Sequence, residues 1–168
     1  TICTATVLIT EGLVKVTEPT TELTLEAPAG LIRITADVRE GKARSITFEN
    51  VPAFAVHLDR AVEAPEVGTV AVDVAWGGMF YALTDASALG FRLTPDEGRD
   101  LVRVGEMVKA AAREQIPVAH PEQPELAGIS IMEWTGPPSV PGADAKNTVV
   151  VSSGTLDCAA SASMHSMR

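Results

Sequence analysis

The first third of the chain alternates polar and apolar residues in short runs that are separated by turn residues. The alternation is found in Thr21–Ala27, in Leu31–Val38 and in Ala43–Asn50. Segment 28–30 contains Pro and Gly, and segment 39–42 contains Gly, so each can turn the chain between two runs. A period of two is typical of strands with one buried face. The pattern therefore predicts an antiparallel meander of three strands.

Four further runs predict strands in the rest of the chain. Thr69–Trp76 and Phe80–Asp85 are joined by a pair of glycines, which is a short turn signal. Ile129–Thr135 and Thr148–Ser152 follow, separated by a proline-rich loop at 136–142. Because strands outnumber helices and most connections are short, we expect a mostly antiparallel α+β fold with few helices.

The clearest helix signal begins at Thr94-Pro95-Asp96-Glu97. This sequence is a capping box with proline at the first helical position. The residues that follow place Leu101, Val104 and Val108 on one stripe. The helix should end near Gln115, because the next residue, Ile116, precedes Pro117 and a residue before proline disfavours helical geometry.

The first twelve residues form a run that is apolar nearly all round, which predicts a buried helix, with a strand as the alternative because of its β-branched residues. Gly12 stands where such a helix would need a left-handed residue. Cys3 lies inside the run and is expected to be buried as a small hydrophobic residue. We expect three parts, with 1–14 as a buried helix and lead-in, 15–155 as the main α+β domain, and 156–168 as a cleft junction and the start of a helix.

Both ends of the sequence are expected to be cut. A buried helix at the first residue leaves its initial N–H groups without preceding partners. At the other end, 158–168 is a small-residue helix candidate that stops at Arg168.

Composition places the chain among soluble globular proteins. It has 168 residues, 46% of them hydrophobic, and a mean hydropathy of +0.17. No run approaches the roughly 20 apolar residues that cross a bilayer. The net charge of −9 would repel nucleic acid and anionic lipid. Two widely separated cysteines form no disulfide framework and no zinc motif, which favours a reducing cytoplasm and predicts no metal site.

A few residues are candidates for chemistry. His57, His120 and His165 are more often structural than catalytic in such contexts. Cys158 follows Asp157 at a predicted junction of strand and helix, where a helix N-terminus would stabilise the thiolate. Asp157 has an alternative role, since Asp is a preferred helix N-cap.

Segments spread over nearly the whole chain resemble the family of proline racemase, hydroxyproline 2-epimerase and trans-3-hydroxyproline dehydratase. No single motif carries the likeness, but the order and spacing of the segments are specific. They are Thr1–Val14, Ala27–Gly30, Asn50–Phe54, Asp73–Ala82, His120–Glu122, Gly142–Asn147 and Gly154–Asp157.

The resemblance implies two acid/base residues on opposite faces of the substrate α-carbon. The family's first motif is Cys/Ser/Thr-Gly-His-x-Thr, and Thr1 matches only its last residue, so the first base would precede this sequence. The second motif is Asp-Arg-Ser-Pro-Cys-Gly-Thr-Gly, of which Asp157 matches the first residue. Either Cys158 is the catalytic cysteine after a three-residue deletion, or about eight residues are absent before it. We favour the second alignment, because His165 then falls where family helices often carry histidine.

The resemblance also implies a function and a fold. By family analogy Asp157 holds the substrate amine, and Glu133 occupies a position that resembles a substrate contact. The expected activity is a cofactor-independent racemase or epimerase of proline or hydroxyproline, a small cyclic amino acid. The alternatives are a trans-3-hydroxy-L-proline dehydratase, which the Thr-Ile-Cys start favours slightly, and a non-catalytic fragment or binding protein that keeps the fold. The implied fold is that of diaminopimelate epimerase-like enzymes, with strands around a central helix, here incomplete, and a possible homodimer.

Overall fold

A computed structural model of the chain describes residues 1–151 and 155–157. The elements fall into two compact units, Thr1–Pro52 and Ala53–Arg168. These units are defined by packing within the chain. The expected boundaries at residues 14 and 155 concern domains of the family fold, and they stay a prediction.

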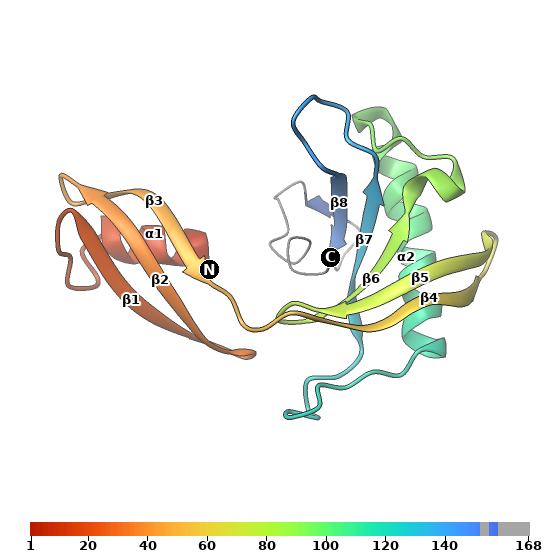
Figure 1. Ribbon diagram of the computed structural model, residues 1–168, viewed down its shortest axis with the longest axis horizontal. Helices are drawn as coiled ribbons and strands as arrows, with labels where there is room; N and C mark the ends of the chain where they lie inside the picture. Colours follow the sequence, from red (N-terminus) through yellow and green to blue (C-terminus); the bar gives the residue numbers. More distant parts are fainter. Residues whose placement is uncertain (152–154, 158–168) are drawn as a thin grey trace. The chain divides into compact units, whose positions relative to one another are not determined.

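The first unit is a three-stranded antiparallel sheet with one helix packed on it (Figure 1). Its elements are α1 (Ile2–Thr10), β1 (Thr20–Ala27), β2 (Gly30–Arg39) and β3 (Lys42–Glu49). The predicted meander is confirmed. Its second turn consists of Glu40 and Gly41, with φ of 55° and 70°. Two positive φ values are typical of the tight turns that match the twist of a hairpin.

The helix α1 is present as predicted, but it buries only one face. Ala5 and Ile9, four residues apart, are buried against the sheet. Val7, two residues from each, lies on the opposite side and is 53% exposed, and Ile2 at the start of the helix is 49% exposed. Cys3 is exposed, so its expected burial is wrong. The reason is that the three strands cover the helix from one side.

Gly12 terminates α1 as the sequence predicts. Its φ is 66°, and the N–H of the next residue, Leu13, donates to the Leu8 carbonyl at 2.9 Å. This bond satisfies a carbonyl that the helix itself leaves unpaired.

The second unit contains a six-stranded sheet in the order β4-β5-β6-β7-β8-β9. The strands are β4 (Phe54–Ala64), β5 (Gly68–Trp76), β6 (Phe80–Asp85), β7 (Ile129–Gly136), β8 (Lys146–Val151) and β9 (Thr155–Asp157). All neighbours are antiparallel except β6 and β7, which are parallel. The predicted α+β class, with mostly antiparallel strands and few helices, is confirmed. The strand β4 was not predicted.

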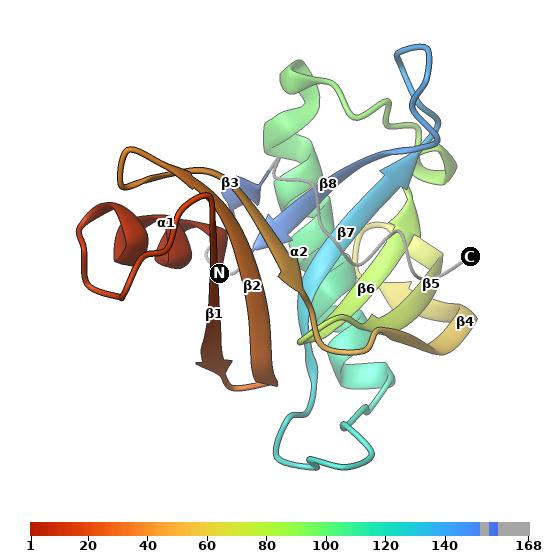
Figure 2. The same ribbon diagram turned by 60° about the vertical axis from the view of Figure 1, so that its left-hand side comes forward.

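The parallel pair is joined by a crossover, residues 86–128, that contains the helical segments described for this unit. They are the short 3₁₀ helices η1 (Ala86–Leu89) and η2 (Pro95–Glu97), and the helix α2 (Gly98–Gln115). Figures 1 and 2 show α2 on one side of the strands. The crossover therefore covers one face of the sheet and returns the chain beside β6.

The backbone of α2 lies very close to the sheet at Gly105. A methyl group added there would stand 2.8 Å from Val150 Cγ2 and 3.1 Å from Trp134 Nε1. Trp134 is fully buried, and its Nε1 donates to the Leu101 carbonyl at 3.1 Å. The glycine thus allows a close approach that packs β7 and β8 against the helix.

The carboxylate of Glu97 fixes the start of α2. Its Oε2 accepts from the backbone N–H groups of Thr94 at 3.1 Å and Arg92 at 2.9 Å. The Thr94 backbone bond, opposed in part by desolvation and aided by the Arg92 bonds, holds the pKa of Glu97 below its ordinary value of 4.5. The predicted capping box is confirmed, although Pro95–Glu97 forms a 3₁₀ turn ahead of the α-helix.

Candidate functional site

The two faces of the β6–β9 sheet differ in what covers them. In β7, Met132 and Trp134 lie against α2. Because successive side chains of a strand point to opposite faces, Glu133 lies on the face away from α2. Val149 of β8 pairs with Glu133 and shares this face.

A buried polar pair lies on this second face. Glu133 is completely buried, and its Oε1 accepts a hydrogen bond of 2.6 Å from Asn147 Nδ2 on the neighbouring strand. Asn147 is half-buried. The distance is at the short end of the range for N–H···O hydrogen bonds in proteins. Glu133 makes at least one further interaction besides this bond.

The register of three strands brings two predicted site positions into line. Val149 pairs with Glu133 on β7 and with Asp157 on β9. Two steps across a sheet separate the backbones of Glu133 and Asp157 by about 9–10 Å. The two positions are therefore near enough to contribute to one small-molecule site. Cys158 and His165 lie outside the described residues.

His120 belongs to an aromatic cluster. Its ring centroid lies 4.7 Å from that of Trp76 and 5.8 Å from that of Phe54. Trp76 in turn lies 4.9 Å from Phe80. The His120 Nδ1 accepts from the Glu122 N–H at 3.3 Å. These contacts hold the loop between α2 and β7 against β4 and β5. His57 lies on β4 and is half-buried.

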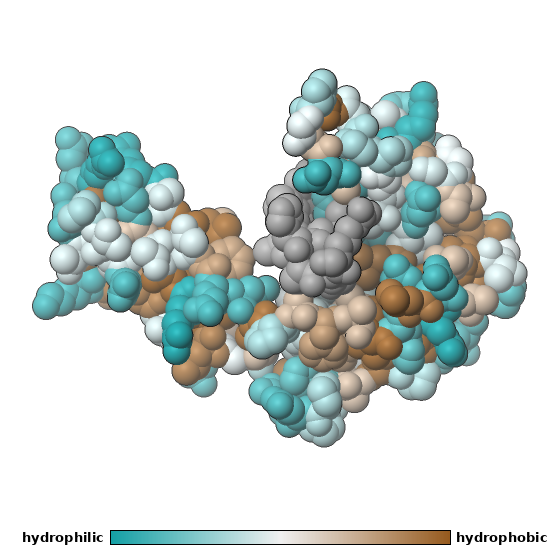
Figure 3. Space-filling view, viewed as in Figure 1, coloured by the Kyte–Doolittle hydropathy of each residue, from teal (hydrophilic) through white to brown (hydrophobic). Residues whose placement is uncertain are grey.

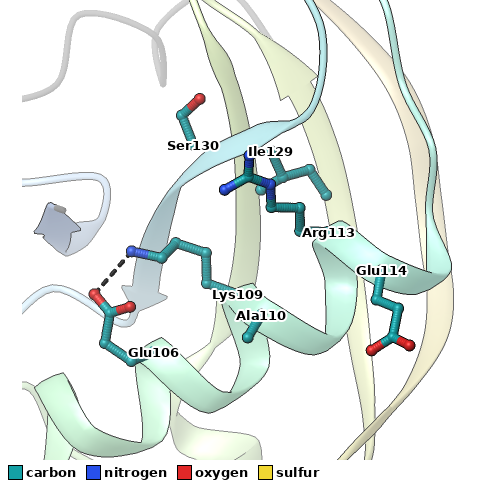
Figure 4. Close-up of a pocket in the computed structure, with 7 residues that line it drawn as sticks. All are labelled: Glu106, Lys109, Ala110, Arg113, Glu114, Ile129 and Ser130. Carbon is teal, nitrogen blue, oxygen red and sulfur yellow. Dashed lines mark hydrogen bonds and ion pairs between the residues drawn. The ribbon is translucent and has the colours of Figure 1, made fainter.

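A hollow of about 510 Å³ lies on the helix side of the sheet, between α2 and the start of β7 (Figure 4). Its charged lining includes Lys109 and Glu106, whose Nζ and Oε1 are 2.7 Å apart. Arg113 and Ser130 also line it. Glu133 does not line this hollow, which makes it distinct from the candidate site.

Other kinds of site are not found in the described part of the chain. No three His, Cys, Asp or Glu side chains gather there as a metal site would require. No helix described in residues 1–151 is long and apolar enough to cross a membrane. On the face drawn in Figure 3, hydrophobic and hydrophilic residues are mixed over the second unit.

Solved structures identify the class of fold. A probable proline racemase from Agrobacterium radiobacter K84, with bound carbonate, is 31% identical with a TM-score of 0.86. A hydroxyproline epimerase from Agrobacterium vitis, with bound trans-4-hydroxy-L-proline, is 32% identical with the same TM-score. Each likeness covers 93% of this chain and 45% of the other. A methylitaconate delta-isomerase, 16% identical with a TM-score of 0.53, shares the fold.

The sequence comparisons identify the family. The proline racemase family model matches residues 1–168, so the chain belongs to the proline racemase family. An uncharacterized protein from Bacillus anthracis is 38% identical over 157 residues, which are 93% of this chain and 44% of that protein. The chain thus spans less than half the length of this relative and of the two Agrobacterium proteins.

Sequence reasoning singled out Glu133 and Asp157 but not Asn147 as a site residue. Asn147 lies in Gly142–Asn147, one of the segments that resemble the family, but no role was predicted for it. Its contact with Glu133 depends on the pairing of β7 with β8, in which Asn147 lies opposite Thr135. The segment resemblance was the signal that could have drawn attention to it.

Proposed function

We propose that the protein is a cofactor-independent racemase or epimerase that inverts the α-carbon of proline or hydroxyproline. The observation that carries this proposal is the likeness, over nearly all of this chain, to a hydroxyproline epimerase that has its amino acid bound. Membership of the proline racemase family supports the same reaction class.

The proposed mechanism is a two-base proton transfer. One base removes the α-proton, and an acid on the opposite face of the α-carbon returns one, which inverts the centre. An α-proton beside a carboxylate is weakly acidic, so the developing negative charge needs hydrogen-bond donors around the substrate carboxylate. Burial of the ring in a site without water strengthens those bonds.

We assign roles to three positions of the site. Asp157 holds the substrate amine, because a carboxylate pairs well with an ammonium group. Glu133 contributes to the substrate site from the neighbouring part of the sheet, which its register with Val149 supports. Under the first alignment Cys158 is one acid/base residue, whereas under the alignment that we favour that cysteine is among the residues absent before Cys158. The partner base of the family pattern matches no residue of this sequence.

The test is exchange of the α-proton in deuterated water, followed by proton NMR, with protein expressed from its complete gene. We expect exchange and inversion with trans-4-hydroxy-L-proline or L-proline. Asp157→Ala should lower kcat/KM by about 10–100-fold, the effect of losing a hydrogen bond to a charged group. Ser130→Ala, on the helix side of the sheet, is the matched control and should leave the rate unchanged.

The other outcomes separate the alternatives. Loss of water from trans-3-hydroxy-L-proline without inversion would identify a dehydratase. An absence of both exchange and dehydration with all three amino acids would contradict the proposal and indicate a binding protein or a non-catalytic fragment.

A further inference from the structure

The strand β4 is the outermost strand of the six-stranded sheet (Figure 1). In the part of the chain that the structure describes, β4 pairs with β5 on one side and with no strand on the other. An edge of this kind presents backbone N–H and C=O groups that a strand of another chain can bind. The outer edge of β4 is therefore a surface at which chains can associate.

The first half of this edge is irregular. The register of β4 against β5 shifts between Ala55 and His57 and again between His57 and Arg60. Asp59, within the second shift, has a φ of 51°. Bulges of this kind bend a strand and interrupt the row of backbone groups that a neighbouring strand needs. The regular part of the edge is therefore confined to residues 60–64.

The side chain of Gln115 lies on that regular part. Gln115 is the last residue of α2. Its Oε1 accepts a hydrogen bond from the Glu63 N–H at 3.0 Å, and its Nε2 donates to the Glu63 carbonyl at 2.9 Å. Two residues that form a hydrogen-bonded pair in an antiparallel ladder exchange the same two bonds. The Gln115 amide thus takes the place of a residue on a neighbouring strand.

The bonds of Glu63 also indicate which backbone groups face outward. Residues of an antiparallel strand alternate between the two edges in the direction of their N–H and C=O groups. Glu63 directs its groups to Gln115 and so away from β5. Ala61, two residues earlier in the same regular register, therefore presents its N–H and C=O on the outer edge as well.

We propose that Gln115 blocks the outer edge of β4 against pairing with the same edge of a second copy of this chain. The second copy is the partner because the edge is self-complementary. Around a twofold axis at Val62, Ala61 of each copy lies opposite Glu63 of the other, and their outward groups all pair. An axis at Ala61 would instead place Asp59 opposite Glu63, and like charges in that position are destabilising.

One side chain is enough to block this pairing. Every hydrogen bond of the twofold pair joins Ala61 of one copy to Glu63 of the other. Gln115 binds both backbone groups of Glu63. A second copy would therefore have to displace the Gln115 amide before it could form any of these bonds.

The experiment measures molar mass by light scattering at several concentrations, with protein expressed from its complete gene. In Gln115→Ala the mass should rise with concentration toward about twice that of the wild-type protein, as for a twofold pair. The wild-type mass should show no such rise. Because Gln115 is exposed, its truncation leaves the core intact. The matched control is Glu114→Ala, a change of the neighbouring exposed residue, which should keep the wild-type mass.

A double variant tests whether the association uses this edge. Ala61→Pro removes an outward N–H, and proline is tolerated on an edge strand whose N–H faces solvent. Added to Gln115→Ala, it should restore the wild-type mass. If Gln115→Ala does not fold, Gln115→Met replaces it, because Met is of similar length but has no amide. An unchanged mass in the folded Gln115 variant would overturn the inference, as would association that persists in the double variant.

Discussion

At the scale of single residues, Glu97 links a backbone turn to the charge state of one carboxyl group. It accepts the N–H groups of Thr94 and Arg92 just before α2 begins, and these bonds are strongest when it is ionised. Its pKa is therefore lower in the folded chain than in the unfolded chain. The unfolded chain takes up the proton first as the pH falls, so the contribution of Glu97 to stability decreases with acidity.

We expect Glu97→Gln to be less stable than the wild-type protein at neutral pH. The difference should be fully present above the ordinary pKa of 4.5 and should disappear as the pH falls through the lower, folded pKa of Glu97. Thermal unfolding of both proteins between pH 7 and pH 3 measures it. Glu114→Gln, a change of an exposed residue of the same helix, serves as the control. A difference in melting temperature that is the same at every pH would argue against this role of Glu97.

Residue contacts were the part of the site that the sequence predicted least well. Glu133 and Asp157 could be selected because their segments resemble a family, but the bond between Glu133 and Asn147 could not. A contact between residues on two strands depends on the register of the pair. The length of the loop at 136–142 does not determine that register. The capping box of Glu97 was predictable because all of its partners lie within five residues in the sequence.

At the scale of elements, the contact of α2 with β7 and β8 depends on the absence of a side chain at Gly105. Replacing glycine by alanine inside a helix normally gains about 1 kcal/mol. Here the new methyl group would meet Val150 Cγ2 at 2.8 Å and Trp134 Nε1 at 3.1 Å. Overpacking of a core costs about 1–3 kcal/mol, which exceeds the gain in helix propensity.

Gly105→Ala should therefore destabilise the second unit by up to about 2 kcal/mol, the net of these two effects. Urea unfolding followed by circular dichroism measures this change. The matched control is Gly98→Ala at the first residue of α2, where the added methyl group meets Leu156 Cδ1 at an ordinary 3.4 Å. That variant should be neutral or slightly stabilised. Equal effects of the two substitutions would contradict the close contact at Gly105.

The elements themselves were largely predictable, and β4 shows why one was not. Its pairing with β5 is irregular between Ala55 and His57 and again between His57 and Arg60. Asp59 has a φ of 51°, and its N–H donates to Asp73 Oδ1 at 2.8 Å. Such irregularities break the alternation of buried and exposed side chains by which a strand is recognised. The apolar stripe of α2, in contrast, is regular along its whole length.

At the scale of the whole molecule, each of the two units has a hydrophobic core of its own. In the first unit Ile34 is packed with Ala5 and Ile32. In the second unit Val108 of α2 is completely buried. Because protection from hydrogen exchange follows cooperative packing units, damage to one core should remain confined to its own unit.

Ile34→Ala should speed amide exchange in β1–β3 while leaving exchange in α2 and β7 unchanged. The local loss of stability should be about 2–4 kcal/mol, as for other truncations of buried Ile. Val108→Ala should give the opposite distribution. Hydrogen exchange with mass spectrometry resolves both regions in one measurement. Faster exchange throughout the chain in either variant would show that the units unfold together.

The parallel pairing of β6 with β7 has a consequence for how the protein is made. On the ribosome, β4, β5 and β6 are synthesised before residues 86–128, and β7 emerges only after that crossover. Until then the N–H and C=O groups along the open edge of β6 have no strand beside them, and such an edge can pair with another nascent chain. The interval of translation between Asp85 and Ile129 is therefore the stage at which chaperones would be most needed.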